Sequence, residues 1–299
     1  MNKSVAVIIP TYNAGSFLPA CLDSIERQDI GREAIEIIIV DAGSTDNSIE
    51  DQRERADVVL VETPPNFDRG EFGAPWQRAR GAEVASCPYL YYFDSDMRMP
   101  PGLLSELVIL ASAAGIGAVV VPEHSIGQGV WADAKAFERD CYFGSKVEAA
   151  RFFSTEAWNE VGGLDWTMGP CDDWDLHSRV LSAGFAIERA SNIVVHNEGK
   201  PSLRALARKR FRYGKELHKA ITKYGLRTTA SYFSPANRGY VRLFREARLK
   251  PVACMAFILM RITEYVSGGI GLIVGQLSHR RVASPCERYG EATRSKQAL

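Results

Sequence analysis

Short apolar runs rich in β-branched and aromatic residues alternate with segments of helical spacing over residues 5–121. Runs of this length between turn residues are typical of strands buried on both faces of a sheet. We predict strands at residues 5–10, 35–40, 58–61, 89–93 and 118–121, and helices at 17–25, 75–86 and 103–113. This order predicts an α/β fold with a mostly parallel sheet and helices on both faces.

Polar residues follow three of these strands directly, at residues 11–13, 41–46 and 94–96. In such sheets ligands bind outside the carboxyl ends of the strands, so these residues are candidates for a site. Asp94 and Asp96 stand at i and i+2 and can converge on one hard divalent cation, which commonly bridges carboxylates to substrate phosphates. A triplet of this kind is also common in surface turns, but its place after a buried strand favours a metal site.

Four segments resemble, in the right order, the motifs of family 2 glycosyltransferases of the GT-A fold. They are VAVIIPTYNAGSFLPACLDSIERQ at 5–28, IEIIIVDAGSTDNS at 35–48, RARGAEVASCPYLYYFDSDMRMPPGLL at 78–104 and GGLDWTMGPCDDWDLHSRVLSAGF at 162–185. The resemblance implies inverting transfer of a sugar from a nucleotide-diphosphate donor to an acceptor. The pathway implied is synthesis of a cell-surface polysaccharide or glycoconjugate. It also implies Mn²⁺ or Mg²⁺, because the charge on the departing diphosphate must be neutralised.

The resemblance assigns the nucleoside pocket to the loops after the first two strands. The residues implied are Pro10, Thr11, Tyr12, Asn13, Asp41 and Ser44. Asp41 would accept a hydrogen bond from the N3–H of uracil or thymine, which makes a UDP- or dTDP-sugar the expected donor. Asp41 can instead be read as a carboxylate that caps the turn and helix start expected at residues 43–46.

The resemblance places the diphosphate and the metal around the triplet. Arg78 would lie near the diphosphate, but Ala79 stands where the family usually has Asn, which leaves Arg80 as an alternative. Asp94 and Ser95 would contact the donor. The implied metal ligands are Asp94, Asp96 and His196, the last from a His-Asn-Glu-Gly segment after a strand-like run. A lone histidine is otherwise more often structural.

Three acidic residues begin the predicted helix at 173–183, in the sequence Asp172-Asp173-Trp174-Asp175. They resemble the family's Glu-Asp-x-Asp pattern, which implies Asp173 as the base that takes the acceptor's hydroxyl proton. Asp172 is the alternative base. The same residues fit an acidic helix N-terminus stabilised by the helix dipole, and both interpretations can hold together.

The net charge of zero conceals two regions of opposite sign. Residues 1–203 carry 16 Lys and Arg against 31 Asp and Glu, whereas residues 204–250 carry 14 against 2. Residues 252–277 are largely apolar but include Arg261 and Glu264, which stand at i and i+3 and can pair. We expect a catalytic domain at 1–203 and a helical region at 204–299 that associates with an anionic membrane surface. A helical hairpin packed on the catalytic domain is the alternative, and a span across the bilayer stays open.

Other features point to the cytoplasmic face of the cell membrane, with the chain peripheral or partly inserted. The six cysteines are scattered, which suits a reducing compartment, and MNKSVAVIIP has no signal-peptide pattern. A dehydrogenase lacks support because no GxGxxG follows the first strand. The loop PTYNAGSF also lacks the Gly-rich, Arg-containing sequence of sugar-phosphate nucleotidyltransferases. A membrane-binding protein with a degenerate transferase fold is the non-catalytic alternative, and no zinc-finger or RNP-like motif supports nucleic acid as a partner.

Overall fold

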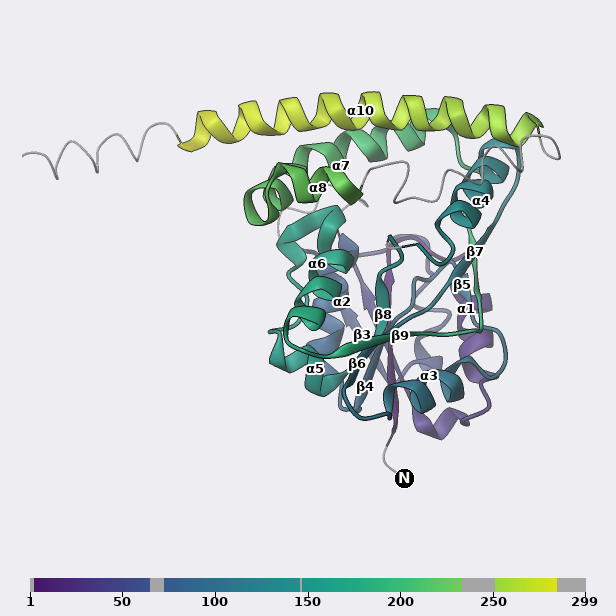
Figure 1. Ribbon diagram of the computed structural model, residues 1–299. Coiled ribbons are helices and arrows are strands. Elements are labelled where there is room, and N and C mark those ends of the chain that lie inside the picture. Colours follow the sequence, from purple (N-terminus) through teal and green to yellow (C-terminus); the bar gives the residue numbers. More distant parts are fainter. Residues whose placement is uncertain (1–2, 65–72, 146, 233–250, 284–299) are drawn as a thin grey trace, which may run out of the picture.

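The structure, a computed structural model, describes residues 3–64, 73–145, 147–232 and 251–283, with side chains to residue 278 (Figure 1). Its centre is a seven-stranded sheet in the order β3-β2-β1-β4-β8-β6-β9. The strands are β1 (Val5–Thr11), β2 (Ile35–Asp41), β3 (Val58–Val61), β4 (Tyr89–Tyr92), β6 (Ile116–Val120), β8 (Ala150–Ser154) and β9 (Ala186–Arg189). All neighbours are parallel except β8, which runs antiparallel to both β4 and β6. The predicted α/β class is confirmed.

Helices cover both faces of this sheet, and successive side chains of β1 divide between two cores. Val5, Val7 and Ile9 point to the core beneath α1 (Leu18–Glu26) and α3 (Leu103–Ala111). Ala6 and Ile8 point to the opposite core, which contains residues of α5 (Thr155–Glu160) and α6 (Asp172–Ser182). On that face Gly81 of α2 (Gly73–Val84) lies so close to Ile8 that a Cβ there would overlap it. The strands therefore match the period of two that a buried sheet requires.

A second sheet of three short strands, β5-β10-β7, extends from the carboxyl edge of the first. Its strands are β5 (Met97–Arg98), β7 (Glu123–Ile126) and β10 (Val194–Asn197). His196 on β10 pairs with Met97 on β5 and with Ser125 on β7. This register places His196 opposite Met97, the residue that follows Asp96, although Asp96 and His196 are 100 positions apart in the chain.

The C-terminal helices lie across the carboxyl edge of the main sheet (Figure 1). They are α7 (Leu203–Tyr224), α8 (Leu226–Tyr232) and the 33-residue α10 (Pro251–Ala283), which packs on α7 and on α4 (Val130–Tyr142). α7 and α10 meet backbone to backbone. A Cβ on Gly271 would overlap the carbonyl oxygen of Phe211, and one on Gly275 that of Lys215. The glycines thus set how closely the two helices approach.

Arg261 and Glu264 form the predicted i,i+3 ion pair on the inner face of α10. Both are buried, and Arg261 also donates to Glu138 of α4 at 2.6 Å. Within the described residues, Pro251–Ser278 is the one helical segment whose length and composition would suit a membrane span. The helix nevertheless follows the protein surface here, as the packed alternative expects.

Two expectations need correction or completion. No helix starts at residues 43–46, because the Asp41 carboxylate holds this segment as a turn; the next helical residues are the 3₁₀ turn η2 (Arg53–Arg55). Strand β8 and helix α4 were not predicted, because residues 123–150 show no clear hydrophobic period. The boundary at residue 203 coincides with the start of α7 and stays a prediction. Residues 233–250 of the basic region lie outside the described residues.

Candidate active site

Hydrogen bonds tie the loops after β1 and β2 into one unit. The Asp41 carboxylate is buried and accepts from the backbone N–H groups of Gly43 (2.9 Å) and Ser44 (2.7 Å) and from the Thr11 hydroxyl (3.0 Å). Asn13 has φ 51°, a conformation that Asn tolerates, and its Oδ1 accepts from the Thr45 N–H at 2.8 Å. The Asp41 carboxylate therefore caps the turn at residues 43–44, and its contact with a nucleotide base stays a prediction. Pro10 is buried, and Tyr12 and Asn13 are not, so this loop presents side chains at the carboxyl edge.

Two arginines hold Asp94. Its Oδ1 lies 2.7 Å from Arg78 Nη2 of α2, and its Oδ2 lies 2.9 Å from Arg151 Nη1 of β8. Burial alone would raise the pKa of Asp94, but the two guanidinium charges outweigh it and hold that pKa well below the usual range. Asp94 is therefore ionised at any physiological pH. Ser95 is the next residue, in the turn that leads to β5.

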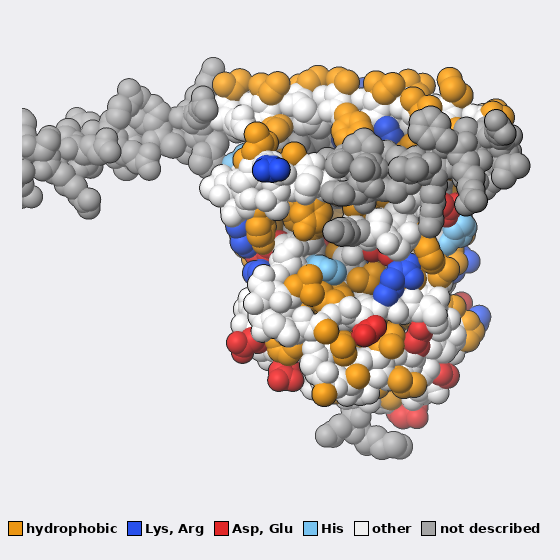
Figure 2. Space-filling model, viewed as in Figure 1, with side chains coloured by type: hydrophobic (Ala, Val, Ile, Leu, Met, Phe, Trp, Pro, Cys, Tyr) orange, Lys and Arg blue, Asp and Glu red, His pale blue; other side chains and the backbone are white. Residues whose placement is uncertain are grey.

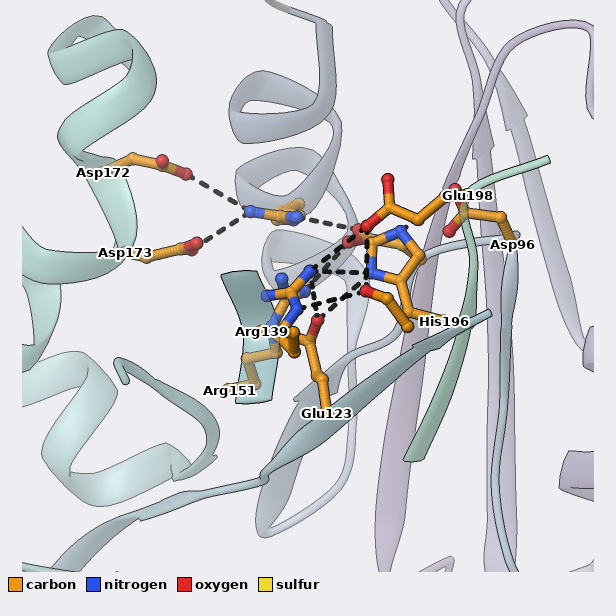
Figure 3. Close-up of polar contacts among 11 residues, drawn as sticks. Asp96, Glu123, Arg139, Arg151, Asp172, Asp173, His196 and Glu198 are labelled. Atoms are coloured by element: carbon orange, nitrogen blue, oxygen red, sulfur yellow. Dashed lines mark hydrogen bonds and ion pairs between the residues drawn. The ribbon is translucent and has the colours of Figure 1, made fainter. Parts of the chain in front are cut away.

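Asp96 and His196 form a second centre (Figure 3). Asp96 Oδ2 lies 3.3 Å from His196 Nε2, while the imidazole Nδ1 lies 3.1 Å from Glu123 Oε2. Burial alone would lower the pKa of His196, but hydrogen bonds to Asp96 and Glu123 raise it to about 9. Asp96 Oδ1 is buried and has no hydrogen-bond partner among the described residues. A buried carboxyl oxygen without a partner is costly unless a cation or a donor reaches it.

The three acidic residues at the start of α6 make two different sets of contacts. Arg78 Nη1 lies 3.1 Å from Asp173 and 3.4 Å from Asp172, so one guanidinium joins α6 to Asp94. Asp175 instead is buried against α7, where the Tyr224 hydroxyl donates to it at 2.5 Å and Lys223 lies at 2.5 Å. Burial, and then the negative charge of Asp173, raise the pKa of Asp172 well above its usual value. Asp173 is the more exposed of the first two acids, which leaves it accessible to a substrate.

The structure settles the position of the two candidate arginines. Arg80 points away from the carboxylates and pairs with Glu62 and Glu83. Arg78 is buried among Asp94, Asp172 and Asp173. The guanidinium near the triplet is therefore that of Arg78, and its contact with a diphosphate stays a prediction.

Four further charged residues lie at the site and are not among the predicted ones; they are Glu123, Arg139, Arg151 and Glu198. Arg151 Nε lies 2.8 Å from Glu123, which also pairs with Arg139 at 3.0 Å. Arg139 reaches Glu198 at 3.7 Å. Arg139 and Arg151 belong to α4 and β8, the two elements that had no readable period. Glu198 stands within the His-Asn-Glu-Gly segment, which was the one available signal.

The charges drawn together in Figure 3 leave a deficit of positive charge. Five carboxylates, at Asp94, Asp96, Glu123, Asp173 and Glu198, face three arginines and His196, and Asp172, whose pKa is raised, adds a sixth acid. In the described part of the chain no three His, Cys, Asp or Glu side chains already converge as metal ligands. The free Oδ1 of Asp96 beside His196 nevertheless suits a hard divalent cation, whose charge would offset the deficit.

This sheet, with a carboxylate pair at its carboxyl edge and acids at the N-terminus of α6, agrees with the GT-A fold that the sequence motifs imply. The family model "Glycosyl transferase family 2" matches residues 6–162, more than half of the chain. The chain therefore belongs to glycosyltransferase family 2.

Individual relatives agree with this membership. The uncharacterised glycosyltransferase YibD of Escherichia coli (strain K12) is 36% identical over 113 residues, which cover 37% of this chain and 31% of YibD. A PGL/p-HBAD biosynthesis glycosyltransferase of Mycobacterium bovis (strain BCG / Pasteur 1173P2) is 28% identical over 211 residues, or 64% and 74% of the two chains. This chain thus matches less than a third of YibD and about three quarters of the mycobacterial protein.

A solved structure shows the same fold. The mannosyltransferase PcManGT of Pyrobaculum calidifontis, in complex with GDP-Man and Mn²⁺, superposes with a TM-score of 0.57 at 19% identity. The superposition covers 98% of this chain and 84% of that one, so it includes the C-terminal helices.

Proposed function

We propose that this glycosyltransferase moves a sugar, with inversion, from a UDP- or dTDP-sugar to a lipid-linked or glycan acceptor in cell-surface polysaccharide or glycoconjugate synthesis. The observation that carries the proposal is the buried, unpartnered Oδ1 of Asp96 beside His196. The Asp41 loop follows β2 and Asp96 follows β4 at the same edge of the sheet, and Arg78 joins Asp94 to the acids of α6, so we expect one substrate to contact all three. The relatives named for biosynthesis and the Mn²⁺ complex of PcManGT support the proposal by likeness.

Mn²⁺ or Mg²⁺ would be held by Asp96 and His196, with Asp94 directly or through water. When bound, the ion neutralises charge on the departing diphosphate. His196 must give up its proton to become a ligand, so binding of the ion would release a proton. Arg78 would then stabilise the diphosphate, in exchange for part of its contact with Asp94.

Asp173 would act as the general base. The acceptor hydroxyl oxygen forms a bond to the anomeric carbon, the hydroxyl proton passes to Asp173, and the bond from that carbon to the diphosphate oxygen breaks. Asp172, whose pKa burial raises, would hold a proton beside it and limit repulsion between the two carboxylates. Thr11 and Asp41 would receive the base of the nucleotide, with Pro10, Tyr12, Asn13 and Ser44 around it and Ser95 beside the ribose or diphosphate.

We also propose that the outer face of α10 rests on an anionic bilayer at the cytoplasmic face of the cell membrane. Exposed apolar side chains follow each other at three- and four-residue steps along that face, visible as the upper edge in Figure 2. They are Val252, Met255, Leu259, Ile262, Val266, Ile270, Ile273 and Leu277. Arg261 and Glu264 point the other way, into ion pairs with Glu138 and Arg210, which favours a helix lying in the interface over one that crosses it.

Hydrolysis of a panel of nucleotide sugars, with and without Mn²⁺, tests the catalytic proposal. We expect the purified protein to hydrolyse a UDP- or dTDP-sugar slowly and only with the metal. Asp96→Ala should abolish this activity and the stabilisation by Mn²⁺ plus UDP, which is about 2.7 kcal/mol at a hundredfold excess over Kd. Asp133→Ala, which removes an exposed acid of α4, is the matched control and should change neither. Metal-dependent turnover that survives Asp96→Ala would refute the assignment of the metal.

A further inference from the structure

A cavity of about 430 Å³ lies between the acids of α6 and the C-terminal helices. Its volume falls in the range of small-molecule sites, roughly 300–1,000 Å³. One end is formed by Asp173 and Arg151, and the other by side chains of α7, α8 and α10. The cavity therefore begins at the proposed base and leads away from the nucleoside loops, which is where an acceptor must enter.

The end at Asp173 is charged. Arg151 lines it while holding Asp94 at 2.9 Å and Glu123 at 2.8 Å, so the same guanidinium borders both the proposed donor site and this cavity. A hydroxyl group placed here would lie beside the base and on the side of Asp94 that faces the acceptor. The polar end of an acceptor belongs at this end.

The far wall offers mostly aromatic and aliphatic surface. Trp174 stacks on Tyr232 with ring centroids 3.6 Å apart, and Leu217 of α7 continues this surface. Tyr265 and Leu272 of α10 complete the wall. The wall also includes Arg210, Arg261 and Glu264, whose charges are already paired with one another and with Glu138. A hydrocarbon chain beside Trp174, Leu217 and Leu272 would remove apolar area from water on both sides.

Two glycines of α10 leave space between the side chains that this helix contributes to the cavity. Gly268 and Gly269 both line it, and a Cβ on Gly269 would meet no atom within 4 Å. The opposite face of α10 carries the exposed apolar row described above (Figure 2). The cavity thus lies directly beneath the surface that would contact a bilayer.

We infer that this cavity is the acceptor site and that its occupant is an amphiphile. Its hydroxyl-bearing head lies at Asp173, and its hydrocarbon chain lies along Trp174 and Leu217 towards α10. The inference rests on the proposed function for the identity of the reaction and narrows its acceptor to a molecule with an apolar chain. The bonds made and broken are those given above, with the attacking oxygen supplied by the head of the amphiphile.

Binding of ethyl, hexyl and octyl β-glucoside below their micelle concentrations tests the inference by calorimetry on the full-length protein. Each methylene that enters an apolar site contributes about 0.8 kcal/mol, or about a fourfold gain in affinity. We expect affinity to rise by up to that factor per methylene. Gly269→Leu places a side chain at the cavity and should weaken octyl glucoside binding at least tenfold. Ser278→Leu adds the same side chain to α10 away from the cavity and should bind like the wild type.

The outcomes separate this inference from the proposed function. Equal affinity for the three glucosides, or unchanged binding by a Gly269→Leu protein with a normal unfolding temperature, would overturn the amphiphile. Tighter binding of cello-oligosaccharides than of octyl glucoside would do the same in favour of a glycan. Chain-length-dependent binding without any metal-dependent hydrolysis of nucleotide sugars would instead support the site and refute the proposed reaction.

Discussion

The close approach of α7 and α10 makes a sharp prediction about two glycines on the same helix. Gly271 and Gly269 lie two residues apart on α10, but a Cβ on Gly271 would overlap the Phe211 carbonyl oxygen, whereas one on Gly269 meets nothing. Alanine at either position raises the free energy of unfolding by up to about 1 kcal/mol, because it restricts the unfolded chain more than glycine does. That gain is common to both variants and cancels in the comparison. Gly271→Ala alone must also push two backbones apart, at a cost of about 1–3 kcal/mol.

Thermal unfolding followed by circular dichroism measures the difference. A change of 1 kcal/mol moves Tm by roughly 2–4 °C in a chain of 150–250 residues, so Gly271→Ala should unfold about 2–12 °C below Gly269→Ala. Gly269→Ala should equal or exceed the wild type. A Gly271→Ala protein as stable as Gly269→Ala would show that α10 does not pack on α7 in this way. The cavity would then not be bounded by α10 as described.

Three further outcomes follow from the site. Asp173→Asn should lower the transfer rate by about 10²–10⁴, the usual contribution of a general base, with little change in Kd for the donor. Arg78→Gln should lower kcat/KM about a hundredfold through loss of a charge at the diphosphate, while the control Arg80→Gln, which breaks surface pairs, should not. Burial alone would raise the pKa of Asp175, but hydrogen bonds from Lys223 and Tyr224 outweigh it and lower that pKa below 3.8. The ionised Asp175 therefore contributes fully to stability above that pH, and this contribution is lost as pH falls. Asp175→Asn should therefore cost about 1–3 kcal/mol in urea unfolding at pH 7 and progressively less below pH 4; an equal cost at both would contradict the ionised pair.

The predicted bounds are most accurate for strands and helices that have a clear pattern of their own. β1, β2 and β3 occupy almost the residues expected, because buried strands read as apolar runs. α7, with Ser202 as N-cap and Gly225 at its end, lies in the region that we expect to be helical. The triplet and the acids of α6 were found for the same reason, since each directly follows or begins a readable element. Of the two candidate arginines, Arg78 lies beside Asp94 and Arg80 does not, while the expected contact of Arg78 with a diphosphate stays a prediction.

What the sequence could not show depends on contacts between distant segments. β8 enters the sheet antiparallel between β4 and β6, and no local pattern states which strands it separates. Arg151 reaches Asp94 only because of that insertion. The helix start expected at 43–46 does not form, because the Asp41 carboxylate accepts hydrogen bonds from the backbone N–H groups of Gly43 and Ser44. These bonds stabilise a turn in place of a helix.

The same long-range contacts join the C-terminal helices to the carboxylates of the candidate site. Arg261 of α10 pairs with Glu138 of α4; the next residue, Arg139, pairs with Glu123, and Glu123 pairs with Arg151, which holds Asp94. Opposite charges alternate at every step, so each buried group is compensated by its neighbour and none can move without leaving another unpaired. The helices that face the proposed membrane thus help to fix the arginine that borders both the donor carboxylate and the acceptor cavity. The predicted boundary at residue 203 separates regions of different composition, and ion pairs such as Arg261–Glu138 cross it.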